Sequence, residues 1–259
     1  MITAPLWFGS GLGNQLFRYV MCRVLALDKG YDFGIEYPER FKGASFMGLD
    51  MGKPVLNGVA HEGGDPLLLP DGIEHFYREK KIIDNGIESY DYDWELLKVK
   101  DKTKIDGEFQ GPKYWEHRKG EIDQWLRVQH IKLPNDLCVI NFRGGEFQHI
   151  KSLFLTKEYW DLGIEKMKSI NPAMKFEVHT DDFLLAMRFF PGLKVIHDIG
   201  INWRSVRYAK YLLLSNSSFA IFPAWLNKRA TVIAPKYWGR RNKGFWHCVY
   251  NQYPNWIYL

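Results

Sequence analysis

The first forty residues change their hydrophobic period twice. A short apolar run over residues 4–8 ends in the glycine-rich stretch 9–13. From Asn14 to Gly30 the apolar residues recur at the three- and four-residue spacing of a helix. Residues 31–36 then alternate between apolar and polar or small side chains, as a strand does. The pattern predicts a strand, a glycine loop, a helix and a second strand, which together form a βαβ-like unit.

The second half of the chain repeats this alternation. Residues 137–142 are apolar throughout, which is typical of a strand buried on both faces of a parallel sheet. Thr156 is a suitable first residue for a helix. Further elements are predicted as strands at 105–109, 176–179, 195–196, near 213 and at 231–234, and as helices at 114–128 and 203–212. Strands that alternate with helices indicate an α/β protein with parallel sheets, and a domain boundary is expected near Pro134 and Asn135.

Composition narrows the class of protein. Apolar residues make up 46% of the chain and charged residues 25%, with a formal net charge of +5, as in an ordinary globular protein. The positive charge is dispersed apart from the cluster at 240–243, so we expect an anionic small ligand and no nucleic acid. Cys22, Cys138 and Cys248 form no CxxC pair, and no apolar run has the length of a membrane span. We therefore expect a cytoplasmic protein without a membrane anchor.

The glycine loop admits two interpretations. Gly11 and Gly13 follow a predicted strand and precede a helix, where backbone N–H groups can approach an anion. The spacing is not GxGxxG, so a tight turn without a ligand remains an equal alternative. Asn14 and Gln15 add two amides at the exit of the loop, and these can orient a polar substrate.

Polar residues also follow three strands of the second half. Arg143 comes directly after the strand at 137–142 and can grip a diphosphate bidentately, or pair structurally with Glu146. His179 and Asp181 stand at the end of the next strand, where carboxylates either bind a nucleotide or cap a helix. The segment 215–219, with Ser217 and Ser218, suits phosphate binding as well as helix capping.

The ordered set of motifs resembles the α-1,2-fucosyltransferase family. Residues 9–17, GSGLGNQLF, are similar to the family's GGLGNQLFQY opening. Residues 105–115, with GEFQ and KYW, are similar to its GYFQ…KYF stretch. Residues 215–236, with NSSF, AWLN and VIAPK, are similar to its C-terminal NSSFSWWAAWLN…VIAPK block. The matches follow the family's order from residue 9 to about 238, and they mark the chain as a divergent member.

The resemblance implies an enzyme of the GT-B type. It implies two Rossmann-like domains, here 1–134 on the acceptor side and 135–259 for the donor nucleotide, and an inverting transfer of fucose from GDP-fucose to a glycan hydroxyl. No cofactor and no catalytic metal are implied. The implied catalytic residues are Arg143, Glu146 and Asn14. The implied donor-binding residues are Gly11, Gly13, Gln15, Asn141, Arg143, His179, Asp181, Ser217 and Ser218.

The departures from the family pattern keep other functions open. The family's HIRRGDY reads NFRGGEF here, so Asn141 replaces a histidine and Gly144 replaces the second arginine. Arg204 and Arg207 are candidates for a compensating cation. The alternatives are a transferase for another nucleotide-sugar and a sugar- or nucleotide-binding protein without catalysis. Asp91 and Asp93 also form a DxD pair, which other glycosyltransferases use to hold a metal, but a solvated acidic turn is the favoured interpretation here.

Overall fold

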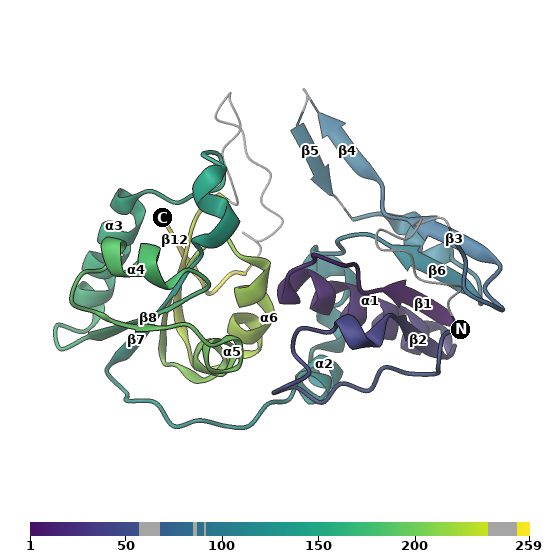
Figure 1. Cartoon of the computed structure of the whole chain (residues 1–259), viewed down its shortest axis with the longest axis horizontal. Coiled ribbons are helices and arrows are strands. Elements are labelled where there is room, and N and C mark those ends of the chain that lie inside the picture. The colour runs from purple at the N-terminus through teal and green to yellow at the C-terminus, as the bar shows by residue number, and fades with distance from the viewer. Residues whose placement is uncertain (57–67, 85–86, 91, 238–252) are drawn as a thin grey trace. The chain divides into compact units, whose positions relative to one another are not determined.

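The protein's structure is a computed structural model that describes residues 1–56, 68–84, 87–90, 92–237 and 253–259. The chain divides into two compact units, Met1–Arg127 and Val128–Leu259. Each unit contains its own parallel sheet with helices packed on it (Figure 1). The predicted α/β class with parallel sheets is confirmed for both.

Within the described residues, no helix is both long and apolar enough to cross a membrane.

The sheet of the first unit is parallel throughout, with the strand order β2-β1-β6-β3. Its strands are β1 (Ile2–Pro5), β2 (Phe33–Glu36), β3 (His75–Arg78) and β6 (Thr103–Asp106). The strand predicted at 4–8 thus begins and ends earlier. The chain leaves the sheet after Pro5 because residues 7–10 form a turn, in which the Ser10 N–H donates to the Trp7 carbonyl at 3.2 Å.

Helix α1 (Leu12–Lys29) connects β1 to β2 and begins at the glycine loop. Its apolar positions lie against the sheet, where Ile2, Ala4 and Ile105 are fully buried. The helix ends at Gly30, which has a φ of 68° and donates its N–H to the last carbonyls. Glycine adopts this left-handed conformation without steric cost, and this is why the helix ends where the sequence predicts.

The remaining elements of the first unit are short. They are the antiparallel pair β4 (Lys81–Asp84) and β5 (Ile87–Tyr90), the 3-10 turns η1 (Pro38–Arg40), η2 (Trp94–Lys98), η3 (Pro112–Tyr114) and η4 (Glu116–Arg118), and helix α2 (Lys119–Trp125). The single helix predicted at 114–128 is therefore wrong. Trp115 leaves helical geometry with a φ of −141°, and its buried ring donates to the Phe109 carbonyl at 3.1 Å. Burying this large ring outweighs the continuity of one helix.

The second unit has the strand order of a doubly wound sheet, β12-β11-β10-β7-β8-β9. All its neighbouring strands are parallel. The strands are β7 (Leu137–Phe142), β8 (Lys175–Thr180), β9 (Lys194–Ile196), β10 (Tyr211–Leu214), β11 (Thr231–Ala234) and β12 (Ile257–Tyr258). The buried strand predicted at 137–142 is confirmed residue for residue.

Helices cover both faces of this sheet (Figure 1). They are α3 (Lys157–Ile170), α4 (Phe183–Phe189), α5 (Ile199–Tyr208) and α6 (Ser218–Leu226), and η5 (Gly145–His149) is a 3-10 turn. Trp160 of α3 packs in the core of one face, and Val206 of α5 in that of the other. The helix predicted at 203–212 lies four residues earlier, because Asp198 caps it by accepting from the Ile201 N–H at 2.7 Å.

Two of the cysteines are buried thiols in separate cores. Burial raises the pKa of both Cys22 and Cys138, so neither thiol ionises readily. Cys248 and the basic cluster at 240–243 lie outside the described residues.

A buried carboxylate fixes the loop that follows β6. Glu79 is 3% exposed, and its Oε2 accepts from the backbone N–H groups of Glu108 at 2.7 Å and Phe109 at 2.9 Å. Burial raises its pKa from 4.5 to about 7, against the lowering effect of these hydrogen bonds. Glu79 thus determines the position of the 107–110 loop at the expense of holding a carboxyl group out of water.

Glu79→Gln is expected to change how the stability depends on pH. Between pH 4.5 and about 7 the folded protein keeps a proton that the unfolded chain has lost, so stability falls as the pH rises through this window. Glutamine keeps an acceptor for the two N–H groups and carries no charge. The free energy of unfolding of the variant, relative to that of the native protein, should rise by about 2–4 kcal/mol from pH 5 to pH 8. Urea denaturation at the two pH values measures this change.

The control is Glu95→Gln, since Glu95 is exposed in the same unit and pairs with Lys98 at 2.7 Å. It should shift stability by less than about 0.5 kcal/mol at either pH. An equal difference between native and Glu79→Gln protein at both pH values would contradict the prediction.

Candidate functional site

The candidate site of the second unit lies where the winding of its sheet reverses. From β7 the chain winds through α3, β8 and α4 to β9, and it then returns through α5 to β10 on the other side of β7. β7 and β10 pair directly, with Asn141 opposite Leu214 at their carboxyl ends. Polar ligands of doubly wound sheets bind at this reversal, because the flanking loops diverge there.

Arg143 follows β7 at this point and is held by two carboxylates. Its Nη2 donates to Glu146 Oε1 at 2.8 Å, and its Nη1 forms an ion pair with Asp181. The ring of Phe147 lies 5.2 Å from the guanidinium. Glu146 is 70% exposed, whereas the side chain of Asp181 is mostly buried. Both the ligand-binding and the structural interpretation of Arg143 therefore have a physical basis, and the Glu146 pair is the weaker of the two contacts.

Two glycines allow Asp181 to approach the chain after β7. Asp181 Oδ1 accepts from the Gly144 N–H at 2.9 Å. A Cβ atom on Gly145, which has a φ of 32°, would lie 2.5 Å from Asp181 Oδ2, and one on Gly144 would lie 2.7 Å from Asp182 Cβ. No side chain fits at position 144 in this packing. The glycines at 144 and 145 are therefore coupled to the close packing of this loop on residues 181–182.

The other side of the reversal is formed by the segment between β10 and α6. The Ser215 Oγ donates to Asn141 Oδ1 at 3.1 Å, and the Ser215 N–H donates to the Asn141 carbonyl at 3.0 Å. Ser217 is the N-cap residue of α6 and Ser218 is its first residue. The structure thus brings Asn141, Arg143 and the start of α6 to the same edge of the sheet. A guanidinium and a helix N-terminus both favour an anion there.

His179 lies inside the second unit and not at its surface. The ring is fully buried, with Nδ1 at 2.9 Å from Asn202 Oδ1 and Nε2 at 3.0 Å from Glu177 Oε1. The contact with His179 lowers the pKa of Glu177 to about 2. The neighbouring Asp182 caps α4 by accepting from the Leu185 N–H at 3.0 Å. In this arrangement His179 ties β8 to α5.

The predicted residues of the glycine loop all lie in the first unit. Gly11 is the N-cap residue of α1, and Gly13 is buried in its first turn. Gln15 is buried too: its Nε2 donates to the Arg40 carbonyl at 2.8 Å, and its Oε1 accepts from the Lys42 N–H at 3.0 Å. Asn14 is partly exposed, and its Oδ1 accepts from Gln110 Nε2 at 3.2 Å. Gln15 therefore holds a loop of its own unit, whereas Asn14 belongs to a polar row near the surface.

The remaining candidates have local roles. Asp93 caps η2 through the Glu95 N–H at 2.9 Å, and Asp91 of the DxD pair lies outside the described residues. Arg204 donates to the Gly200 carbonyl at 3.1 Å, and Arg207 donates to the Leu226 carbonyl at 2.8 Å, so both bind to helix backbone. In the part of the chain that the structure describes, no group of three His, Cys, Asp or Glu side chains could hold a metal ion.

Sequence reasoning missed a buried cation of the first unit. Arg18 on α1 donates to the Gly107 carbonyl at 2.9 Å, to Ser10 Oγ at 2.9 Å and to Glu108 Oε1 at 2.8 Å. Its side chain is 7% exposed. A charge inside an amphipathic helix was the available signal, because a cation on the buried face of a helix needs partners. Two of the three partners, Gly107 and Glu108, are about 90 residues distant and could not be read from the sequence.

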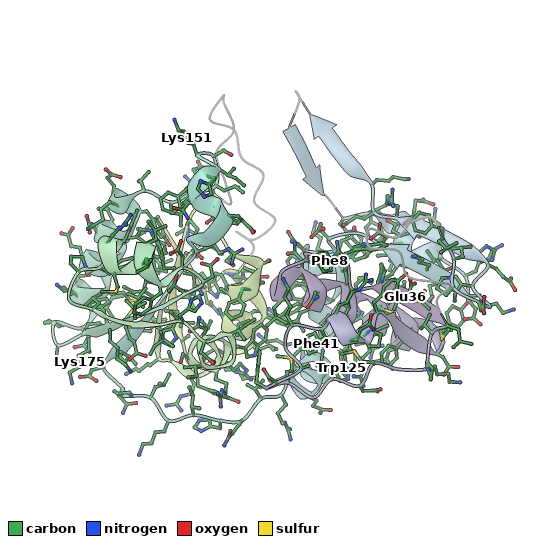
Figure 2. All side chains as sticks on the ribbon, in the orientation of Figure 1. Phe8, Glu36, Phe41, Trp125, Lys151 and Lys175 are labelled. Carbon is green, nitrogen blue, oxygen red and sulfur yellow. The ribbon has the colours of Figure 1, made fainter. Side chains whose placement is uncertain are left out.

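A second buried ion pair, also missed, supports the same sheet. The Lys104 Nζ lies 3.1 Å from Glu36 Oε2 and donates to the Leu68 carbonyl at 2.8 Å. Thr3 Oγ1 donates to Glu36 Oε1 at 2.9 Å. Burial raises the pKa of Glu36, while Lys104 lowers it. Figure 2 labels Glu36 within this unit, where it links the first two strands.

The comparisons with known proteins include a weak likeness to a solved structure. No protein-family model matches the chain, and no curated protein matches it. A solved structure described as NodZ alpha-1,6-fucosyltransferase soaked with GDP-fucose is similar with a TM-score of 0.46 and 10% sequence identity. The likeness covers 86% of this chain and 92% of that one. At this TM-score it carries no argument, so the interpretation of the site depends on its own geometry.

Gly144→Ala should destabilise the second unit, because its Cβ would overlap that of Asp182 and force the loop apart. We expect a loss of about 1–3 kcal/mol in the free energy of unfolding, measured by denaturant titration. Gly120→Ala is the matched control: Gly120 is in α2 with open space around its Cα, so alanine should be neutral or stabilising by up to about 1 kcal/mol. Equal effects of the two substitutions would contradict the packing argument.

Proposed function

We propose that the protein is a glycosyltransferase that moves a sugar from a nucleotide-sugar to a hydroxyl of a glycan. One observation carries the proposal: Arg143 and the start of α6 flank the reversal between β7 and β10. A guanidinium and a helix N-terminus at this edge suit a diphosphate. The motif order then favours GDP-fucose as the donor and an α-1,2-fucosyltransferase-like product.

The proposal divides the chain between the two substrates. Residues 135–259 form the donor-nucleotide domain and residues 1–134 the acceptor side of a GT-B enzyme. In the donor domain Asn141, Asp181, Ser217 and Ser218 accompany Arg143, and His179 supports them from within the core. The glycine loop of the first unit also takes part in the proposed transfer through Gly11, Gly13 and Asn14. Gln15 supports this loop from within the core. We propose that the protein acts in the cytoplasm.

The chemistry is a direct displacement. The acceptor oxygen forms a bond to the anomeric carbon as the bond to the β-phosphate oxygen breaks, and the configuration inverts. The proton of the acceptor hydroxyl passes to solvent water or to the exposed Glu146 carboxylate, and GDP leaves with an additional negative charge on its β-phosphate. Arg143 stabilises this charge, and the N–H groups at the start of α6 add to the effect. We propose that this displacement requires no metal ion.

Glu146 is proposed to hold Arg143 ready for the donor. It occupies Nη2 at 2.8 Å and is exposed, so a diphosphate can replace it while Asp181 retains Nη1. Because the diphosphate replaces the Glu146 carboxylate at the Nη2 of Arg143, the guanidinium stays paired with an anion before and after the donor binds.

Arg143→Ala is expected to lower turnover at least about 100-fold and to weaken GDP binding, because the cation at the leaving group is removed. Transfer from GDP-fucose and GDP affinity by calorimetry are the measurements. Arg188→Ala, which removes an exposed cation on α4 of the same unit, should leave both unchanged. Near-normal turnover in Arg143→Ala would locate the phosphate site elsewhere.

Glu146→Gln is expected to separate the two roles of this carboxylate. If Glu146 only holds Arg143, losing its charge should tighten GDP binding about 2- to 10-fold at low salt, because the competing anion is gone. A loss of turnover of about 100-fold with unchanged GDP affinity would instead assign it the acceptor proton.

Three functions remain to be distinguished: a fucosyltransferase, a transferase for another nucleotide-sugar, and a binding protein without catalysis. Measuring the release of nucleotide from a panel of GDP- and UDP-sugars separates them. Transfer from GDP-fucose that persists in EDTA supports the proposal, and abolition by EDTA would overturn the metal-independent mechanism. A preference for a UDP-sugar would refute the donor but not the enzyme class. Tight GDP binding without transfer or hydrolysis would favour a binding protein.

A further inference from the structure

The sheet of the first unit has its own winding reversal. From β1 the chain passes through α1 to β2 on one side, while β6 lies on the other side of β1. The loops after β1 and β6 therefore diverge at the carboxyl edge, as in the second unit. The first of these is the glycine loop, and the second is residues 107–110.

Arg18 joins the two loops. Its guanidinium donates to Ser10 Oγ of the glycine loop and to the Gly107 carbonyl of the second loop, both at 2.9 Å. A third bond, at 2.8 Å, reaches Glu108 Oε1. With three partners and little exposure, Arg18 is a fixed part of the structure. It places a permanent positive charge beside the Glu108 carboxyl group.

Three polar side chains form a row at this edge. Glu108 Oε2 and Asn14 Oδ1 both accept from Gln110 Nε2, at 3.4 Å and 3.2 Å. Glu108 is 25% exposed, and the other two are also partly exposed. Each carboxylate and amide oxygen accepts more than one hydrogen bond, so the row can bind a ligand while keeping its internal contacts.

The backbone beneath the row is rigid. Glu79 accepts from the N–H groups of Glu108 and Phe109, and Trp115 donates to the Phe109 carbonyl. An exposed aromatic side chain, Phe8, comes just before the glycine loop and is 76% exposed (Figure 2). A carboxylate, two amides and an accessible ring are the groups that recognise a sugar, through its hydroxyls and its apolar face.

We propose that Glu108, Gln110 and Asn14 bind neighbouring hydroxyl groups of a saccharide, with Glu108 as the main acceptor. Arg18 is a positioning residue that fixes the Glu108 carboxylate. The row carries a carboxylate and is therefore unsuited to the anionic donor. Its occupant is the neutral acceptor glycan, and this part of the inference rests on the proposed function.

This chain departs from the quoted family motifs at two positions of the site, Arg18 and Glu108. Arg18 stands where GGLGNQLFQY has its second glutamine, and Glu108 stands where GYFQ has tyrosine. The two departures are in direct contact in the structure. The carboxylate and the cation at which this chain differs from the two quoted motifs thus form one ion pair.

Glu108→Gln is the first test. Saccharide binding is measured by saturation-transfer NMR and titration with the methyl β-glycosides of galactose, glucose and N-acetylglucosamine. Removing the charge should weaken binding about 10- to 100-fold, since hydrogen bonds to a charged group are the strong ones. GDP affinity should be unchanged. Glu95→Gln, an exposed carboxylate of the same unit, should bind like the native protein.

Gln110→Ala is the second variant, because Glu108→Gln leaves Arg18 without its charged partner and can unfold the unit. It removes one member of the row and leaves the Arg18 pair in place, and it should weaken saccharide binding at least about 5-fold. Unchanged binding in Gln110→Ala, or in folded Glu108→Gln, would overturn the inference.

Failure of this inference is distinguishable from failure of the proposed function. Native protein that binds GDP and releases it from GDP-fucose, but binds none of the glycosides with or without GDP, overturns the saccharide row alone. Native protein that binds a glycoside through Glu108 but no nucleotide overturns the transferase and leaves the saccharide row supported.

Discussion

The pairing of β7 with β10 is the constraint on which the candidate donor site depends. Because the winding reverses between them, the loops after these strands are free to diverge, and neither is covered by a crossover helix. Asn141 and Ser215 are hydrogen-bonded to each other for this reason, although they are far apart in sequence. The ion pair of Arg143 with Asp181, which follows β8, then aligns the guanidinium at the edge. Backbone topology thus provides the location of Arg143, and a partly buried carboxylate provides its orientation.

Local patterns predicted the parts of the fold that local physics determines. The apolar run of β7 and the glycine that ends α1 each leave little choice to the backbone. The helix expected at 114–128 failed because Trp115 is buried against Phe109, a contact that no periodicity within the segment reveals. The start of α5 was misjudged for a simpler reason: Asp198 is an N-cap signal, and it precedes the apolar residues that suggested the helix.

The same distinction applies to the candidate site. Position after a strand identified Arg143 and Asp181, and the structure joins them. It could not identify Arg18 or Glu79, whose partners lie about 30 to 90 residues away and come together only after β3, β6 and α1 have packed. It also could not foresee that the close approach of Asp181 and Asp182 excludes a side chain at position 144. This steric constraint at position 144 is independent of whether the protein is active.

The two winding reversals carry opposite electrostatics. In the second unit a guanidinium is held by carboxylates, and the residue that we propose to bind the donor is the cation, Arg143. In the first unit a carboxylate is held by a guanidinium, and the residue presented is the anion, Glu108. A cation with displaceable partners suits a diphosphate that brings its own negative charge. An anion with a buried, permanently charged partner suits hydroxyl donors, which bring none. The two sheets, each with a winding reversal, thus favour chemically different ligands. The proposed transferase requires this difference, because its donor is charged and its acceptor is neutral.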